Sequence, residues 1–413
     1  MDGPVTRGTW GMRTNVLRRG QGHDSNRVGY IELFFDLVFV FAVTQLSHSL
    51  ITHPDLTTLG HTLILAAAVW YMWIDTTWVT NWLDPERLPV RALLITMMLF
   101  GLVMSGAIPE AFGPKALLFA VTFVTIQVGR SLFTVFALAR HWPVNAVNFA
   151  RITIWLAVSG VFWIAGALVG DDRLQLALWA LAVVIDYCGP RAMFRVPVLG
   201  ATDPATWTVR GEHMAERVGL FMIITLGESI IITGSAFAEL DLAPVTVAAF
   251  LAAFASTVLM WLLYFDRAEG RATAYFAGSE RTGMIAQTGY TYVPLLMVLG
   301  IVGTAVADEL VLLHPMGHDG VGHADPWTAG LICGAAAVFL VGNVLFRRAT
   351  GRAWSRPHLA GVAALALLYA AHVVLTPLAL NWISNAVLLG VLCWDLAGTD
   401  DAVGTAPEPT SDR

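Results

Sequence analysis

Residues 32–48 read ELFFDLVFVFAVTQLSH, a run of Phe, Leu, Val and Ala that contains two carboxylates, Glu32 and Asp36. Together with its apolar neighbours, the run is long enough to cross a bilayer core of ~30 Å, which takes about 20 residues of helix. A carboxylate at the centre of such a helix costs about 2.5–3.5 kcal/mol. The stretch therefore predicts a membrane-spanning helix with two acids on one face, because residues four apart lie above one another.

The composition of the whole chain indicates the same class. Apolar residues make up 56% of the 413, charged residues only 13%, and the mean hydropathy is +0.66. A soluble domain has about 25% charged residues, so this chain lacks the side chains for an ordinary water-facing surface. The three cysteines all lie in apolar stretches, which indicates packed thiols and no disulfide framework. We expect an all-α integral membrane protein.

Apolar runs of spanning length recur along the chain and predict a bundle of about twelve spans. They cover roughly residues 30–51, 59–80, 90–108, 115–140, 146–169, 174–189, 213–237, 243–265, 283–306, 328–347, 359–375 and 379–396.

The basic residues predict the orientation of these spans. If the N-terminus is cytoplasmic, 21 of the 24 basic residues fall on the inner side, and the outer loops hold only Lys115 and Arg173. Cytoplasmic loops carry such an excess of Lys and Arg. We expect a protein of the inner membrane with both termini in the cytoplasm. Residues 1–28 form a cytoplasmic segment without the apolar core of a signal peptide, and the acidic tail 397–413 is expected to be disordered.

Short matches between corresponding spans predict an internal repeat. RVG occurs at 27–29 and 217–219, an aromatic run ends in Asp75 and again in Asp266, and VGRSLF at 128–133 corresponds to VGNVLF at 341–346. IDYC at 185–188 and LCWD at 392–395 are a fourth match. We expect two parallel six-helix halves, 29–188 and 212–396, joined by a cytoplasmic linker at 189–211.

Ionisable residues within the spans are the candidate functional sites. Asp36, Asp75 and Glu228 lie deep in apolar runs, Glu32 lies near the inner boundary, and Arg130 is the one basic residue placed deep in a span. Because one cation cannot neutralise three carboxylates, we expect these residues to line a hydrated transport or proton pathway between the halves. Alternatively, Glu32, Glu216 and Arg217 are interfacial, and Arg130 forms a buried pair that fixes helix register.

Other kinds of site have little support in the sequence. The loop from His314 to Asp325 contains metal-capable residue types, but no spacing that matches a standard metal site. There is no phosphate-binding loop, no HExxH and no GxSxG. We expect no catalytic residue, no metal, no cofactor and no nucleic-acid partner, and the sequence does not predict an oligomeric state.

Two of the segments resemble a known family. ELFFDLVFVFAVTQL at 32–46 and HMAERVGLFMIITLGESI at 213–230 are similar to the signature segments of the bacterial low temperature requirement A proteins, and the likeness extends over roughly residues 25–396. The resemblance marks as characteristic Glu32 and Asp36 in the first segment, and His213, Glu216, Arg217 and Glu228 in the second. It implies a multispan membrane protein and names no substrate.

Three functional hypotheses remain open. The favoured one is a secondary transporter or proton-linked permease for an unidentified small solute, with a channel as its nearest variant. The second is a membrane sensor or assembly factor in cold adaptation, which does not transport and acts through the linker or the tail. The third is a membrane enzyme acting on lipid, with the His314–Asp325 loop as its candidate site.

Overall fold

The computed structural model describes residues 16–18, 28–203, 206, 209–269, 286–317, 322–350 and 353–397. Every regular element in these ranges is a helix, and two isolated β-bridges join Leu17 with Leu83 and Val196 with Gly200. The predicted all-α fold is confirmed. Most of the N-terminal segment, the acidic tail after Ala397 and the middle of the His314–Asp325 loop lie outside the described residues.

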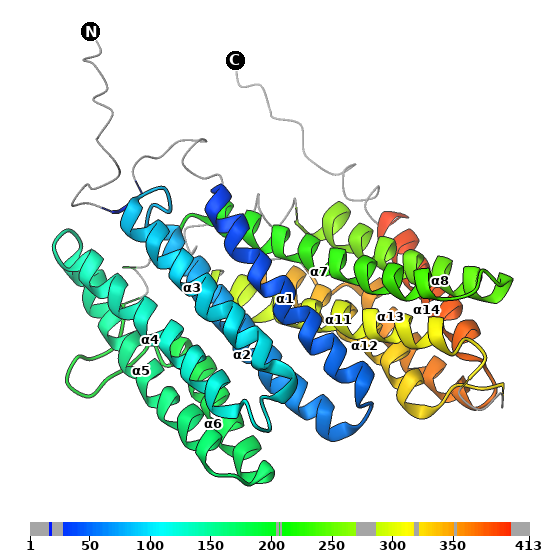
Figure 1. Cartoon of the computed structure of the whole chain (residues 1–413). Helices are drawn as coiled ribbons and strands as arrows, with labels where there is room; N and C mark the ends of the chain where they lie inside the picture. Colours follow the sequence, from blue (N-terminus) through cyan, green and yellow to red (C-terminus); the bar gives the residue numbers. More distant parts are fainter. Residues whose placement is uncertain are drawn as a thin grey trace, which may run out of the picture. The chain divides into compact units, whose positions relative to one another are not determined.

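The chain divides into two compact units, and α7 (Gly211–Glu239) runs from one into the other. The first unit comprises residues 1–225 and 273–295. Its helices are α1 (Tyr30–Thr52), α2 (Leu56–Trp82), α3 (Leu88–Ala107), η3 (Ile108–Glu110), α4 (Ala116–Ala139), α5 (Pro143–Leu168), α6 (Asp172–Arg191) and η6 (Ala286–Tyr292), together with the start of α7 (Figure 1).

The second unit comprises residues 226–272 and 296–413. Beside the rest of α7, its helices are α8 (Pro244–Trp261), η5 (Leu262–Glu269), α11 (Val293–Leu313), α12 (Pro326–Ala349), α13 (Arg356–Tyr369), η7 (Ala370–Val373) and α14 (Pro377–Ala397). The first three residues of α11 belong to the first unit. The predicted division into two six-helix halves with a linker at 189–211 stays a prediction.

Local sequence signals determine where several helices begin. Asp55, Asp171 and Asp325 precede α2, α6 and α12, and each side chain accepts hydrogen bonds from backbone amides in the first turn. These amides have no partner within the helix, so the aspartates satisfy them. Proline occupies the first turn of α3, α5, α8 and α12, where its missing N–H costs nothing.

The helices correspond to the expected spans with two main differences. The ninth run was expected at 283–306, whereas α11 extends from Val293 to Leu313 and includes Asp308 and Glu309. The eleventh was expected at 359–375, whereas α13 ends at Tyr369 and a short 3₁₀ turn follows. Among the described residues, 10 helices are long and apolar enough to cross a membrane, and neither α6 nor α13 is one of them.

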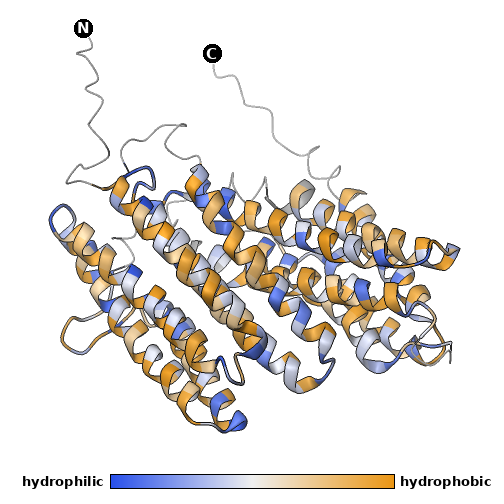
Figure 2. Cartoon of the chain, in the orientation of Figure 1, coloured by the Kyte–Doolittle hydropathy of each residue, from blue (hydrophilic) through white to orange (hydrophobic). Residues whose placement is uncertain are grey.

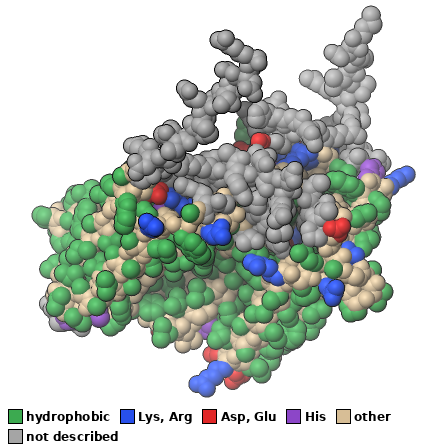
Figure 3. Space-filling view, turned by 180° about the vertical axis from the view of Figure 1, so that it is seen from behind, with side chains coloured by type: hydrophobic (Ala, Val, Ile, Leu, Met, Phe, Trp, Pro, Cys, Tyr) green, Lys and Arg blue, Asp and Glu red, His purple; other side chains and the backbone are tan. Residues whose placement is uncertain are grey.

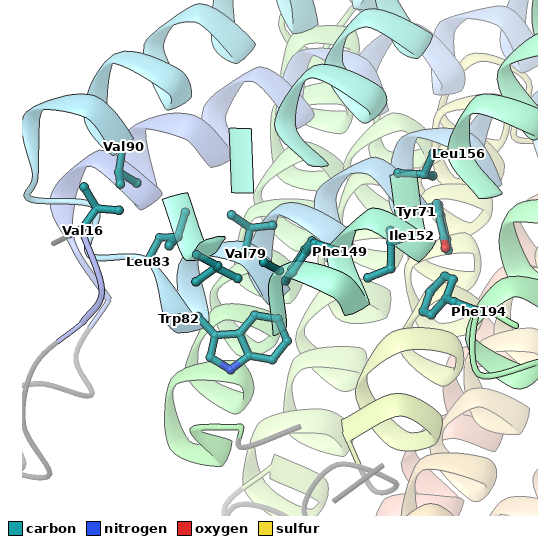
Figure 4. Close-up of a cluster of buried hydrophobic side chains, with 12 residues drawn as sticks. Val16, Tyr71, Val79, Trp82, Leu83, Val90, Phe149, Ile152, Leu156 and Phe194 are labelled. Carbon is teal, nitrogen blue, oxygen red and sulfur yellow. The ribbon is translucent and has the colours of Figure 1, made fainter. Parts of the chain in front are cut away.

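A cluster of large apolar side chains packs the first unit between α2 and α5. Trp82 meets Phe149 edge-on, with ring centroids 5.4 Å apart, and Val79, Ile152 and Leu156 belong to the same cluster (Figure 4). Val16, which precedes the first helix by fourteen positions, is buried there as well. The short segment around Val16 is therefore held against the helices by its own hydrophobic contact.

The outward helix faces are as apolar as the interior. Orange residues extend along the helices in Figure 2, and hydrophobic side chains cover much of the surface seen in Figure 3. Phe136, Leu99 and Val161 are 76%, 63% and 65% exposed. A soluble monomer rarely exposes contiguous apolar patches of this extent, so these faces indicate contact with lipid. The chain is an integral membrane protein.

Candidate functional site

Glu32 and Asp36 lie one turn apart on α1, and both side chains are fully buried in the first unit. Glu32 occupies the third position of its helix, where its Oε2 accepts a hydrogen bond from the Gly29 amide at 2.9 Å. An acid at this position commonly reaches back to the helix start. The hydrogen bond at the start of α1 therefore orients the Glu32 side chain without any contact from another helix.

Arg217 on α7 joins the two carboxylates. Its Nη1 donates to Glu32 Oε1 at 3.0 Å, and its Nη2 donates to Asp36 Oδ1 at 2.6 Å. The guanidinium also lies over the ring of Trp73 on α2, 5.6 Å from its centroid, and the Trp73 indole N–H donates to Asp36 Oδ1 at 2.8 Å. Only arginine combines a rigid fork of donors with a planar face for an aromatic ring. Since Arg217 is fully buried, the interpretation of this residue as interfacial is wrong.

His213 completes the network one turn before Arg217. The Asn81 Oδ1 accepts from the backbone N–H of Arg210, and its Nδ2 donates to the Arg210 carbonyl oxygen and faces His213 Nδ1 at 3.3 Å. This fixed amide makes Nδ1 the acceptor, so the ring proton lies on Nε2. This nitrogen lies 3.0 Å from Glu32 Oε1 and 3.1 Å from Arg18 Nη2, and of the two only the Glu32 oxygen accepts a proton. The arrangement assigns His213 as a neutral imidazole that donates to Glu32.

A second arginine reaches Glu32 from the segment before α1. Arg18 Nη2 donates to Glu32 Oε2 at 2.7 Å. The segment is held in place by two backbone hydrogen bonds, from Arg18 N to Trp82 O at 2.9 Å and from Asp84 N to Val16 O at 2.8 Å. With two arginines, two carboxylates and a neutral histidine, the cluster is balanced in charge, which permits its burial.

The two carboxylates differ in how completely they are satisfied. Glu32 has four donors, namely Gly29 N, Arg18, His213 and Arg217, which fill its four lone-pair directions. Asp36 Oδ1 has two donors, but its Oδ2 has no hydrogen-bond partner among the described residues. Of the pair, only Asp36 keeps an open oxygen.

Arg130 on α4 forms a separate cluster with α2. Its Nη2 donates to Asp75 Oδ2 at 2.9 Å, and its Nη1 donates to Thr76 Oγ1 and to the Met72 carbonyl oxygen, both at 3.0 Å. Trp73, which bonds Asp36, projects from the other side of α2, because residues 73 and 75 differ by about 200° around a helix. Asp36 is therefore bonded by Arg217, and Asp75 by Arg130.

Asp186 on α6 adds a further carboxylate near this pair. It lies within electrostatic range of Asp75 and Arg130, and its Oδ2 accepts from the Trp163 indole at 3.4 Å. Its Oδ1 has no partner among the described residues, and neither do the Tyr71 hydroxyl and the Gln127 amide, both buried in the same unit. Among the described residues Arg130 forms an ion pair with Asp75, and Asp186 lies near this pair without an ion pair of its own.

The remaining predicted residues lie apart from this network or at its edge. Glu216 is exposed, and its carboxylate accepts from the Val28 amide at 3.3 Å. Glu228 is buried on the part of α7 that belongs to the second unit. No group of three or more His, Cys, Asp or Glu side chains suited to a metal occurs within the described ranges, and His318 and Asp319 lie outside them.

Sequence reasoning missed Arg18, Asn81, Asp186 and Asp308. Arg18 was one basic residue among five in an N-terminal segment, and Asn81 comes at the end of a helix with no charge to mark it. Asp186 was visible only as part of the IDYC match. Asp308 lies just beyond the ninth expected span, 283–306, whereas α11 continues to Leu313.

Comparison with known proteins gives one family. The model of the bacterial low temperature requirement A proteins matches residues 27–393. The chain is also 38% identical over 383 residues to an uncharacterized protein of Rhizobium meliloti (strain 1021), and the alignment covers 92% of each chain. No solved structure matches. Both resemblances include the helices that form the buried cluster, and the chain therefore belongs to the bacterial low temperature requirement A protein family.

Proposed function

We propose that this protein is a secondary transporter or proton-linked permease of the inner membrane. The observation that supports it is a surplus of buried carboxylates in membrane helices over the basic groups that pair with them. Asp36 keeps an open oxygen, and neither Asp186 nor Asp308 forms an ion pair with a basic side chain among the described residues. Acids of this kind in spanning helices are typical of ion and proton pathways.

In this proposal Glu32 and Asp36 have different roles. Glu32 holds Arg18, His213 and Arg217 together and keeps its negative charge, because four donors surround it. Asp36 accepts and releases a proton or contacts the solute through Oδ2, the oxygen with no partner. Because Arg217 bonds both acids, it is affected when Asp36 exchanges a proton or contacts the solute. No residue has a catalytic role.

Helix packing favours the internal repeat that such a transporter would use. In the first unit α2 packs on α4 and α6, and α5 packs on both α4 and α6. In the second unit α8 packs on α14, its continuation η5 packs on α12, and α13 packs on both α12 and α14. These pairs lie at corresponding positions of the proposed halves, 29–188 and 212–396, although α12 also packs on α14 and α4 does not pack on α6 to the same extent. Parallel repeats of six spans are known in transporter folds.

The same proposal includes twelve spans with both ends of the chain in the cytoplasm. α6 and α13 would then cross the membrane although their length or composition alone does not qualify them. α6 packs on α5, and α13 packs on α12 and α14. Such contacts between helices stabilise a span, but the hydropathy of a single helix does not include them.

Flux through reconstituted vesicles tests the proposal. Proteoliposomes with a pH-sensitive dye inside would be exposed to a proton gradient, with candidate solutes added in turn, for the parent chain and for Asp36→Asn. We expect uptake by the parent and a loss of at least about tenfold in the variant, which corresponds to 1.4 kcal/mol.

Glu239→Gln is the matched control, since Glu239 is an exposed carboxylate at the end of α7. It should leave flux unchanged. Equal flux in the parent and Asp36→Asn would contradict the assignment of Asp36, and absence of any proton-linked flux across the solute classes would contradict transport.

A further inference from the structure

Within the described residues of the second unit, one buried carboxylate has no charged partner. Asp308 on α11 is 1% exposed, and no basic side chain of the described residues pairs with it. Its surroundings contrast with those of Asp395 on α14, which forms a two-bond pair with Arg347 at 2.8 and 2.6 Å. A lone ionised carboxylate in such a place is costly unless a cation neutralises it.

Neutral oxygen-bearing side chains surround Asp308. Asn381 Nδ2 donates to Asp308 Oδ1 at 2.7 Å, and Ser256 Oγ lies 3.3 Å from the same oxygen. The Ser256 hydroxyl is also 2.9 Å from Asn385 Oδ1 and 3.4 Å from Asn381 Oδ1. All three neighbours are at most 4% exposed. They come from α8 and α14, so three helices meet at this point.

The hydrogen bonds within this cluster leave an oxygen without a donor. Ser256 has a single hydroxyl proton, which three side-chain oxygens and the Ala252 carbonyl oxygen at 3.1 Å can accept, and it serves only one of them at a time. Asn385 Nδ2 donates to the Ala252 carbonyl oxygen at 2.9 Å and to Asn381 Oδ1 at 3.3 Å. Asp308 Oδ2 has no partner among the described residues, and the hydroxyl of Thr304, one turn earlier on α11, has none either. Asp308 Oδ2 is therefore the carboxylate oxygen that the described side chains of this cluster leave open.

We infer that Asp308, Ser256, Asn381 and Asn385 form a binding site for one small monovalent cation, Na⁺, for which H⁺ competes at the Asp308 carboxylate. One negative charge matches one positive charge. Carboxylate, amide and hydroxyl oxygens are ligands suited to hard cations, and the site offers no nitrogen or sulfur ligand. A divalent ion would leave an excess positive charge that nothing in the cluster balances.

Few other titratable groups face the site. α8 has no ionisable residue between Pro244 and Trp261, and on α11 only Glu309 adjoins Asp308. α7, which packs on α8 where Ser229 lies 3.1 Å from Thr257, carries the buried Glu228. α12 and α14 contribute Cys333, Cys393, Arg348 and the Arg347–Asp395 pair. Since that pair is already neutral, the charge that a cation would meet in the cluster is that of Asp308.

Thermal unfolding of the purified full chain in detergent tests this inference. Choline chloride would be replaced stepwise by NaCl at constant ionic strength and alkaline pH. A ligand that binds the folded state raises Tm with the logarithm of its concentration, so we expect a rise of about 2 °C for each tenfold increase in Na⁺. At acidic pH the same rise should need more Na⁺, because protons occupy the carboxylate.

Two substitutions make the test specific. Asp308→Asn removes the charge but keeps an oxygen for Asn381, so this variant should be more stable than the parent in choline chloride and should not respond to Na⁺. Asp395→Asn is the matched control: it disrupts the pair with Arg347 in the same unit, and it should lower Tm but keep the Na⁺ response.

Ser256→Ala keeps the test decisive if Asp308→Asn does not fold. Loss of one ligand oxygen should shift the Na⁺ response to about tenfold higher concentration, and alanine is easily accommodated in α8. A flat response of the parent to Na⁺ at alkaline pH would overturn the inference, and so would an equal response in Asp308→Asn. This measurement is independent of flux, so its failure would leave the transport proposal to be decided by Asp36.

Discussion

Two acids that look alike in the sequence have different surroundings in the folded chain. Glu32 and Asp36 are one helical turn apart on one face, yet the first has four donors and the second has two on a single oxygen. The difference comes from the helix start and from Arg18, which reach Glu32 only. Glu32 is therefore predicted to determine stability, and Asp36 activity.

Replacing Glu32 by Gln should destabilise the protein strongly. The amide cannot serve four donors, and Arg18 and Arg217 lose an anion that they share, so we expect a loss of about 3–5 kcal/mol. Asp36→Asn should lose less than half as much, because Arg217 keeps its bond to Glu32. Thermal unfolding in detergent measures both. Equal losses would show that the four donors do not make Glu32 more important for stability than Asp36.

The Arg130–Asp75 pair is suited to a double-mutant cycle. Arg130→Met leaves a carboxylate uncompensated, and Asp75→Asn leaves a buried guanidinium without its anion, so each single variant should lose about 3 kcal/mol. The double variant should lose less than the sum by at least about 1 kcal/mol, because neither partner of the pair is left as an uncompensated charge. Additive losses would mean that Arg130 depends on Thr76 and Met72 more than on Asp75.

At the scale of elements, close helix packing depends on small residues. A methyl group added at Gly300 of α11 would lie 2.6–2.8 Å from the backbone and Cβ of Phe339 on α12, and one added at Gly342 would meet Met297 at 2.6 Å. Membrane helices commonly approach each other at such positions, where backbones come into direct contact. The α11–α12 pair is the clearest case in the second unit.

Gly300→Ala should therefore destabilise the protein by about 1–3 kcal/mol, because backbone atoms cannot yield as a flexible side chain can. Gly334→Ala on α12 is the control: nothing lies within 4 Å of the added methyl, and alanine favours a helix. Thermal unfolding of both variants checks the contrast. A Gly300→Ala variant as stable as the parent would mean that the two helices separate at little cost.

At the scale of the molecule, the open question is how many helices cross the bilayer. α6 is the informative case, since its 20 residues span about 30 Å but it is not among the 10 apolar candidates. Its two ends carry exposed residues, Asp172 at the start and Arg195 just after the end. The twelve-span proposal places Asp172 outside and Arg195 in the cytoplasm.

Cysteine labelling tests that placement. In a chain with its three native cysteines replaced by serine, Asp172→Cys should react with a membrane-impermeant maleimide on spheroplasts, and Arg195→Cys should react only in inverted vesicles. Each variant is also labelled in the other preparation, Asp172→Cys in inverted vesicles and Arg195→Cys on spheroplasts, as the control for access. Labelling of both positions from the same side would show that α6 does not cross.

The sequence by itself determined the class of the protein and most of its helices. Long apolar runs cannot be packed in water, and proline and aspartate at helix starts act through neighbouring residues, so both signals are local. The family motif also identified the charged residues that meet, namely Glu32, Asp36, His213 and Arg217. Spacing showed that Glu32 and Asp36 share a face, but it could not show their partners.

Only the tertiary structure decided which charges neutralise one another. Arg217 bonds both Glu32 and Asp36, and Arg18 bonds Glu32 from the N-terminal segment. Arg130 bonds Asp75 on the other side of α2. The same holds for Asp308, whose neighbours come from helices 52 to 77 positions away along the chain. An ion pair depends on distances of a few ångströms between helices, and a sequence read one helix at a time does not contain them.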